Sequence, residues 1–197
     1  MSMLWIGGWG IAPAWGLAQV EARFPDMEHV WRAPSADVLG DVESFDRLAG
    51  YSLGANLLLR MGLGYQALLL APFMDFKKEA GLGGRVSLTQ LRYLQRWLRR
   101  NPLDALNDFF ERAALAYRAT ELPYAKEDLL WGLEQLMADT DAGIARGCTA
   151  MLGLEDPLLD TEALSGFFEK TERLSGVGHD LAGLLRGVPN PVLGTNS

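Results

Sequence analysis

The sequence Gly-Tyr-Ser-Leu-Gly at residues 50–54 constrains the fold of this chain more than any other feature, because it fits the pattern G-x-S-x-G. Glycines two positions before and after a serine remove side chains that would clash across a sharp turn from strand to helix. Residues 48–51 form a short apolar run, and residues 54–61 are rich in Ala and Leu, as such a turn requires. The pattern therefore predicts a strained, exposed and nucleophilic Ser52. An ordinary strand–helix turn is the alternative, because Gly and Ser are common residues.

Short apolar runs of the kind that form buried strands recur along the chain and alternate with helical patterns. The runs are residues 3–6, 29–31, 48–51, 66–73, 148–152 and 173–175, and the first helices are expected at 13–22 and 54–61. Strands that alternate with helices predict an α/β fold, with a mostly parallel sheet and helices on both faces.

The middle of the chain differs, because residues 87–146 carry no convincing strand pattern. Apolar residues at spacings of three and four predict amphipathic helices there, at residues 92–100, 107–119 and 127–138. We interpret residues 74–147 as a helical cap inserted into a core formed by residues 1–73 and 148–197. The last residues, 188–197, are expected to be irregular.

A weak nucleophile such as serine needs a general base, and the chain offers two histidines, His29 and His179. His29 precedes Ser52 and lies in or beside a weak strand. His179 follows Ser52, in a glycine-flanked loop after a short β-like segment. Because serine, acid and histidine follow one another in this order where G-x-S-x-G sits on a parallel sheet, we predict that His179 is the base.

The acid that orients the base should follow a strand between Ser52 and His179. Asp156 fits this position, because an apolar run and a glycine precede it and a proline turn follows it. Its neighbours Glu155 and Asp160 are alternatives. Asp75 is a separate candidate, because it follows another predicted strand.

Acyl chemistry also needs backbone donors for an oxyanion. One is the N–H of Leu53, the residue after the nucleophile, at the start of a helix. The second should come from a loop after an early strand, and Trp9 in the glycine-rich residues 7–10 is placed for that role.

Neither glycine-rich segment fits a nucleotide-binding loop. With Gly8 and Gly10 as the first glycines of G-x-G-x-x-G, Pro13 falls where the third glycine belongs. Residues 81–84 are not followed by Lys-Ser or Lys-Thr, so they do not form a phosphate loop.

Composition excludes several classes of function. The formal net charge of −7 argues against general nucleic-acid binding. Because Cys148 is the single cysteine, an intramolecular disulfide is excluded. Together with only two histidines, it also argues against a structural zinc site. No run approaches the ~18 apolar residues of a membrane span, and the first residues do not resemble a secretory signal. We expect a cytoplasmic protein with neither metal nor cofactor.

These motifs resemble those of the pimeloyl-acyl-carrier-protein methyl ester esterases of biotin synthesis. Residues 4–10 resemble the strand and His-Gly-Trp-Gly loop of that family, with Gly7 in place of the histidine. Residues 50–55 resemble its nucleophile turn, Gly-Trp-Ser-Leu-Gly-Gly, and residues 153–156 and His179 fall where its acid and base would be. The resemblance spans roughly residues 3–73 and 148–185. The opening hairpin usual in the family is not seen before the strand at residues 3–6, and in this the sequence is similar to the compact members. The segment from 31 to 45 is also abbreviated.

The resemblance implies an α/β-hydrolase fold with a helical cap insertion, and removal of the methyl group from a pimeloyl-carrier-protein ester. A separate feature agrees with an acidic carrier protein as partner. Between residues 84 and 101 there are five arginines and no acidic residue, and four of them share one helical face. A basic face on an acidic protein favours an acidic partner, although solvated arginines with local ion pairs are the alternative. The four are Arg92, Arg96, Arg99 and Arg100.

The sequence leaves two alternative functions open. A general short-chain carboxylesterase or an acyl thioesterase would use the same serine turn. A catalytically inactive protein of the same fold would act as a binding partner, although the complete set of serine, acid and histidine argues against it.

Overall fold

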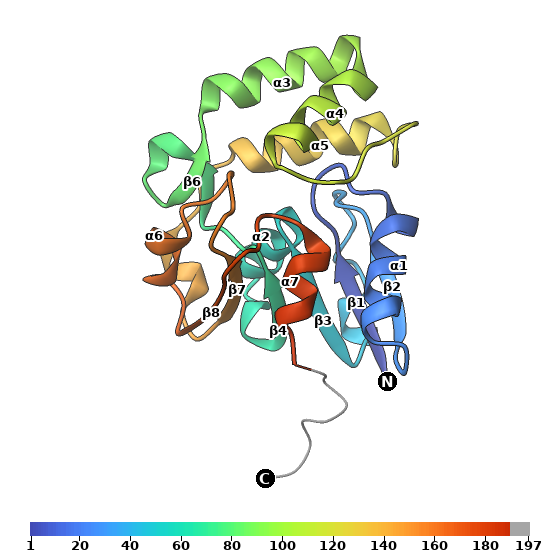
Figure 1. The fold of residues 1–197 in the computed structure, drawn as a ribbon, viewed down its shortest axis with the longest axis vertical. Coiled ribbons are helices and arrows are strands. Elements are labelled where there is room, and N and C mark those ends of the chain that lie inside the picture. The colour runs from blue at the N-terminus through green and yellow to red at the C-terminus, as the bar shows by residue number, and fades with distance from the viewer. Residues whose placement is uncertain (190–197) are drawn as a thin grey trace.

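Six parallel strands form the main sheet in the computed structural model of the chain (Figure 1), which describes residues 1–189 apart from the side chains of residues 142 and 144. The spatial order is β2-β1-β3-β4-β7-β8. The predicted α/β class with a parallel sheet is confirmed. Of the tail expected to be irregular, residues 190–197 lie outside the described residues. The strands are β1 (Ser2–Ile6), β2 (Glu28–Arg32), β3 (Arg47–Tyr51), β4 (Ala67–Leu70), β7 (Thr149–Gly153) and β8 (Lys170–Leu174).

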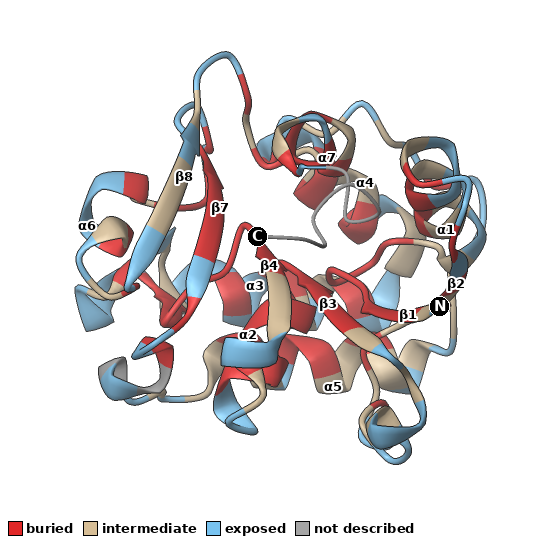
Figure 2. Ribbon diagram, turned by 90° about the horizontal axis from the view of Figure 1, so that it is seen from below, coloured by how far each residue is buried: buried red, intermediate tan, exposed pale blue. Residues whose placement is uncertain are grey.

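Helices cover both faces of this sheet, as predicted. Helix α1 (Pro13–Arg23), which has Pro13 at its first position, packs against α7 (Leu181–Gly187) on one face. Helix α2 (Leu53–Arg60) packs on the other face against β1, β3 and β4 (Figure 2). The short helix α6 (Thr161–Ser165) lies between β7 and β8 in the chain. The 3-10 turns are η1 (Val42–Ser44), η2 (Gly64–Gln66), η3 (Lys78–Ala80) and η4 (Ala142–Ala145).

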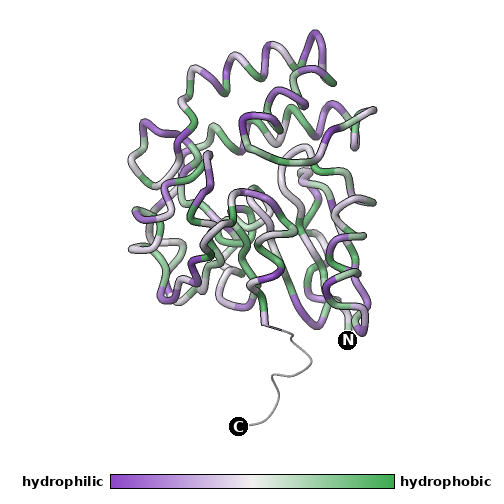
Figure 3. Tube along the Cα trace, viewed as in Figure 1, coloured by the Kyte–Doolittle hydropathy of each residue, from purple (hydrophilic) through white to green (hydrophobic). Residues whose placement is uncertain are grey.

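The central strands are apolar on both faces because helices cover both sides. In β1, consecutive side chains are fully buried, and Trp5 stacks against Trp31 of β2 with ring centroids 6.1 Å apart. Gly16 of α1 makes room for Trp31, since a Cβ there would lie 2.4 Å from the indole. Figure 3 shows the apolar character of these strands.

A helical layer stands above the carboxyl ends of the strands (Figure 1). It contains α3 (Leu88–Arg100), α4 (Pro102–Arg112) and α5 (Lys126–Met137), and α3 packs against both of the others. Figure 3 shows apolar and polar positions alternating along α3, as expected of an amphipathic helix. No helix among the described residues is both long and apolar enough to cross a bilayer.

One helix and one strand differ most from the sequence-based expectation. The helix expected at 107–119 is α4, which Pro102 begins early and which ends before Ala114, a residue in the left-handed region with φ of 53°. Strand β4 is shorter than the expected run of residues 66–73, because Ala71 also has a positive φ, 45°. The sequence also missed a small parallel sheet formed by β5 (Asp75–Lys77) and β6 (Gly83–Val86).

Candidate active site

The candidate site lies where the strand order of the sheet reverses. The chain passes from β1 outward to β2 and then returns to the other side of β1 as β3. The loops that leave β1 and β3 therefore run in opposite directions and open a crevice at the carboxyl ends of the strands. Residues 7–10 follow β1, and Ser52 follows β3, so both predicted segments meet at this crevice.

The turn at Ser52 is a strained elbow rather than an ordinary turn. Ser52 has φ of 54° and ψ of −113°, a backbone conformation that side chains rarely adopt. A Cβ on Gly50 would lie 2.5 Å from the Cα of Ala55, and one on Gly54 would lie 2.0 Å from the carbonyl oxygen of Ile6. Both glycines of the motif are therefore required for α2 to approach β1 and β3 this closely.

A continuous chain of hydrogen bonds, called the relay below, joins the side chains of Ser52, His179 and Asp156. The Nε2 atom of His179 lies 2.9 Å from the Oγ atom of Ser52, and its Nδ1 atom lies 2.6 Å from Oδ2 of Asp156. All three side chains are buried, and Ser52 is only 7% exposed. The predicted exposure of Ser52 is therefore wrong, because Phe109 of α4 and Leu136 of α5 line the narrow hollow beside it. The arrangement lets the imidazole take a proton from the serine while the carboxylate stabilises the charge that forms on the ring.

The backbone around Asp156 fixes its carboxylate. Its Oδ1 atom accepts the N–H groups of Leu158 at 2.8 Å and Leu159 at 3.2 Å, so Oδ2 is directed to His179. The guanidinium of Arg85 donates to the Asp156 carbonyl oxygen at 3.1 Å. These three hydrogen bonds hold the loop that presents the acid.

The alternative acids are engaged elsewhere. Asp75 is buried, but its Oδ1 atom accepts the N–H of Lys77 and its Oδ2 atom lies 3.1 Å from the Lys77 ammonium. Asp160 caps helix α6 by accepting the N–H of Ala163 at 3.1 Å. Glu155 is exposed. Of these carboxylates and Asp156, the described structure places only Asp156 in hydrogen-bond contact with His179.

His29 has a structural role. Its Nδ1 atom accepts the indole N–H of Trp5 at 3.1 Å, and its Nε2 atom lies 2.9 Å from the carbonyl oxygen of Phe24. Both ring nitrogens therefore form hydrogen bonds within the core, beside β1 and β2. In the described part of the chain, His29 has no contact with the relay.

Tyr51 is a site residue that the sequence reasoning missed. Its hydroxyl donates to the carbonyl oxygen of His179 at 2.6 Å, which anchors the loop that carries the base. Burial, and then the negative charges of Asp156 and Asp180, raise the pKa of Tyr51 well above its ordinary value, so the hydroxyl stays a neutral donor. Asp180 fixes the same loop on its other side, because it caps α7 through the N–H of Gly183.

The loop after β1 is fastened to the layer above it. The indole N–H of Trp9 donates to the carbonyl oxygen of Leu129 at 2.8 Å, and Gly132 leaves room for the ring on α5. The hydroxyl of Tyr124 accepts the N–H of Gly10 at 2.7 Å, and burial raises the pKa of this tyrosine.

These contacts leave the backbone N–H of Trp9 without an acceptor among the described residues. Leu53 opens α2, where the first N–H groups have no intrahelical acceptor. Both predicted oxyanion donors thus have a free N–H beside the elbow, and their role stays a prediction.

The hollow beside Ser52 is narrow and mostly apolar. Its accessible volume is about 10 Å³, room for about one water molecule. Among the described residues, no group of three or more His, Cys, Asp or Glu side chains is arranged to hold a metal ion. The hollow is lined by Gly8, Trp9, Ile11, Tyr51, Ser52, Phe76, Phe109, Leu115, Leu136 and His179.

The four arginines predicted to bind a partner are all exposed on α3, opposite the buried Leu91, Leu94 and Leu98. Within the described part of the chain, none of the four lies within ion-pair distance of a carboxylate. Arg92 lines a shallow hollow together with Glu134 and Asp139.

Comparison with known proteins supports the fold. No family model matches the chain, and no curated protein matches it in sequence. Solved structures do match. An esterase from Exiguobacterium antarcticum has a TM-score of 0.68 at 12% identity, with 91% of this chain and 85% of that chain covered.

Two further structures match at 12% identity. A hydrolase from Oleispira antarctica has a TM-score of 0.63, and the match covers 98% of this chain and 89% of that chain. BioG from Haemophilus influenzae has a TM-score of 0.59, and the match covers 90% of this chain and 88% of that chain. The chain therefore has the α/β-hydrolase fold, as the sequence predicted. Because one fold hosts many functions, its function must be argued from the site.

Proposed function

We propose that this protein is a serine carboxylesterase that hydrolyses an acyl ester, with Ser52 as nucleophile, His179 as general base and Asp156 as the group that orients it. The observation that carries the proposal is the unbroken relay from Oγ of Ser52 through His179 to Asp156. The strained elbow adds support, because strain of this kind is held only where surrounding contacts maintain it.

The reaction proceeds in two halves. The Oγ atom of Ser52 attacks the ester carbonyl while Nε2 of His179 takes its proton, and the backbone N–H groups of Trp9 and Leu53 stabilise the oxyanion. The alcohol leaves with the proton from Nε2. Water, activated by the same nitrogen, then attacks the acyl-enzyme and releases the acid.

A fluorophosphonate probe tests this proposal, since it labels an activated serine covalently. We expect the mass of one adduct on the native protein and none on Ser52→Ala. Hydrolysis of p-nitrophenyl butyrate should fall on the order of 10³-fold or more in the same variant. Ser175→Ala is the matched control, because Ser175 is exposed. Absence of labelling on the folded native protein would instead favour a binding protein of this fold.

We further propose a methyl ester carried on pimeloyl-acyl-carrier protein as the natural substrate. The proposal rests on the resemblance of residues 4–10 and 50–55 to the esterases of biotin synthesis and on the exposed arginines of α3. Complementation tests it. Expression of the native chain should restore growth without biotin to a strain that lacks its pimeloyl ester esterase, and Ser52→Ala should not. If the native chain hydrolyses small esters but fails to restore growth, the general carboxylesterase is the better assignment.

A further inference from the structure

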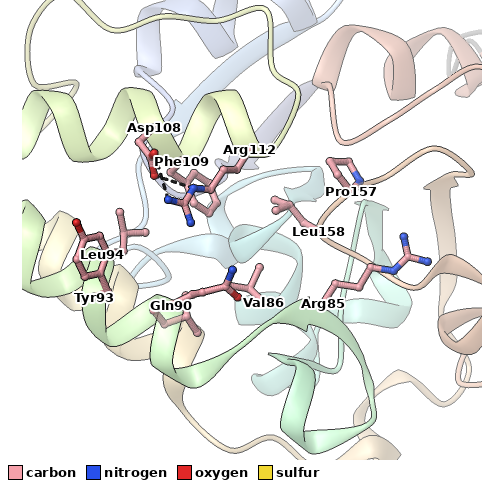
Figure 4. Close-up of a pocket in the computed structure, with 11 residues that line it drawn as sticks. Arg85, Val86, Gln90, Tyr93, Leu94, Asp108, Phe109, Arg112, Pro157 and Leu158 are labelled. Carbon is pink, nitrogen blue, oxygen red and sulfur yellow. Dashed lines mark hydrogen bonds and ion pairs between the residues drawn. The ribbon is translucent and has the colours of Figure 1, made fainter.

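A second hollow lies directly beside the one at Ser52. Its accessible volume is about 200 Å³, far more than the narrow space at the nucleophile. It opens between α3, α4, β6 and the loop after Asp156 (Figure 4). Phe109 of α4 lines both hollows, so this one side chain is a shared wall.

Phe109 is held as a buried partition. It is 8% exposed, and its ring meets Trp9 edge-on with centroids 4.9 Å apart. Beyond it, Leu94 of α3 and Leu158 next to the acid loop continue an apolar surface. A path from Ser52 past Phe109 would therefore run along apolar side chains.

The outer end of this second hollow is polar. Asp108 and Arg112 form an ion pair at 2.8 Å, and Arg85 and Gln90 also line the opening (Figure 4). A ligand that fills the hollow would thus have its middle among apolar groups and its far end near polar groups and solvent. A linear chain matches this arrangement better than a compact ring.

We propose that the second hollow is the acyl-chain subsite of the esterase and that Phe109 determines the chain length it accepts. This inference rests on the proposed function. The space at Ser52 is too small for an acyl chain, and the larger space begins behind Phe109. The alcohol oxygen has to leave beside Nε2 of His179, a residue that lines only the first hollow of the two. The acyl chain is therefore the arm that extends past Phe109.

A chain-length series tests the proposal. We would measure kcat/KM for p-nitrophenyl butyrate, hexanoate, octanoate and decanoate. In Phe109→Ala the two hollows join, so the octanoate-to-butyrate ratio should rise about tenfold or more, as differences of one or a few methylenes do in apolar pockets. Phe109→Trp should lower the same ratio. Phe109→Leu, which keeps an apolar side chain, should shift the ratio in the direction of Ala and serves if the alanine variant fails to fold.

Phe110→Ala is the matched control. Phe110 is a buried phenylalanine of the same helix, but it packs against Tyr117 and lines neither hollow. Its removal should lower stability and leave the chain-length ratio unchanged. An equal shift in both variants, or no shift in any Phe109 variant, would overturn the inference.

Esters with a constant acetyl group and alcohols of increasing length complete the test. Phe109→Ala should leave their relative rates unchanged, and a shift confined to this series would assign the subsite to the alcohol instead. If the native protein shows neither ester hydrolysis nor fluorophosphonate labelling, the proposed esterase function is refuted. If the native protein is an active esterase but no Phe109 variant changes the chain-length ratio, only the acyl-chain subsite is refuted.

Discussion

At the scale of single residues, the strained backbone of Ser52 depends on the absence of side chains around it. Holding a residue at a rare φ and ψ costs on the order of 1–3 kcal/mol, which the packing of α2 on the sheet must offset. Gly54 is where this packing is closest, because its neighbour there is the backbone of Ile6. Backbone cannot rotate away as a flexible side chain can.

Gly54→Ala should therefore unfold the elbow. A Cβ 2.0 Å from the carbonyl oxygen of Ile6 forces α2 away from β1, so we expect a loss of about 3 kcal/mol or more of unfolding free energy. Denaturant unfolding measures this loss, and esterase activity should fall with it. Gly40→Ala is the control, since a Cβ there meets only the carbonyl oxygen of Asp37 at 3.4 Å. Similar stability of both variants would contradict this account of the motif.

The assignment of the acid is also decided at residue scale. Asp156→Asn keeps the shape of the relay but favours the wrong imidazole tautomer, so kcat should fall about 10⁴-fold with little change in stability. Asp75→Asn should do the reverse, because Asp75 pairs with Lys77 and not with His179. Steady-state kinetics and thermal unfolding of both variants separate the two effects. A folded Asp75→Asn protein as inactive as Asp156→Asn would move the role to Asp75.

The three relay residues could be proposed from sequence because their signals are local: a glycine-flanked serine, and an acid and a histidine after β-like runs in the expected order. The choice between Asp75 and Asp156 stayed open, because both follow apolar runs. Tyr51 gave no signal at all, since its hydroxyl contacts the backbone of a residue 128 positions away. Only the folded arrangement reveals such contacts.

At the scale of elements, one buried lysine links the small sheet to α5. The ammonium of Lys77 donates to the carbonyl oxygens of Met137 at 3.0 Å and Ala138 at 2.9 Å, at the carboxyl end of the helix. It also lies 2.8 Å from Asp139 and 3.1 Å from Asp75. A cation at this end satisfies free carbonyls and opposes the helix dipole favourably.

Lys77→Met should loosen this attachment and leave Asp75 as a buried, unpaired charge, at a cost of roughly 3 kcal/mol. Burial lowers the pKa of Lys77, but its hydrogen bonds to Asp139 and Asp75 outweigh burial and raise it overall. The hydrogen bond from Lys77 lowers the pKa of Asp139. Because the pKa of Lys77 is raised, its charge stabilises the folded state fully below pH 10.5, the ordinary pKa. This stabilisation is lost as pH rises through the pKa of Lys77 in the folded protein. Because the pKa of Asp139 is lowered, its charge stabilises the folded state above pH 3.8, the ordinary pKa. This stabilisation is lost as pH falls through the pKa of Asp139 in the folded protein.

The stability difference between native protein and Lys77→Met should therefore be largest between these limits and shrink in strong acid and strong base. Urea unfolding at a series of pH values measures it. Lys78→Met is the control, because Lys78 is exposed beside it. A difference that does not vary with pH would show that packing, and not charge, accounts for the effect of Lys77.

Long helices were the most predictable elements, because apolar spacing over several turns identifies α3 and α5 within a few residues of their ends. The predicted end of α4 lies seven residues beyond the observed end at Arg112, because apolar spacing continues after Ala114. The backbone at Ala114 nevertheless has a left-handed conformation, which ends the helix. Strands β5 and β6 were missed because three or four residues carry no period, and such strands form only by pairing with each other.

At the scale of the whole molecule, the site exists only because the parallel sheet brings three distant loops to one edge. The segments that carry the nucleophile, the acid and the base follow β3, β7 and β8, which are not all neighbours in the sheet. Alternation of strands and helices predicted that these loops share one edge, because parallel strands end on the same side. It could not predict the helical layer's contact with Trp9, which depends on Gly132 and Leu129 of α5.

The charge of the whole molecule sets the last prediction. On a chain of formal net charge −7, the exposed arginines of α3 form a local basic face that would attract an acidic carrier protein. Reversing Arg92, Arg96 and Arg99 to Glu should lower kcat/KM for a carrier-protein ester by about one to a few powers of ten, because rim charges act mainly on encounter and register. Hydrolysis of p-nitrophenyl butyrate should hardly change, and added salt should reproduce part of the loss.

The control reverses three exposed arginines outside α3 and so changes the net charge equally; they are Arg146, Arg173 and Arg186. Equal losses in both triple variants would assign the effect to net charge, and equal losses on both substrates would assign the arginines to the packing of the helical layer.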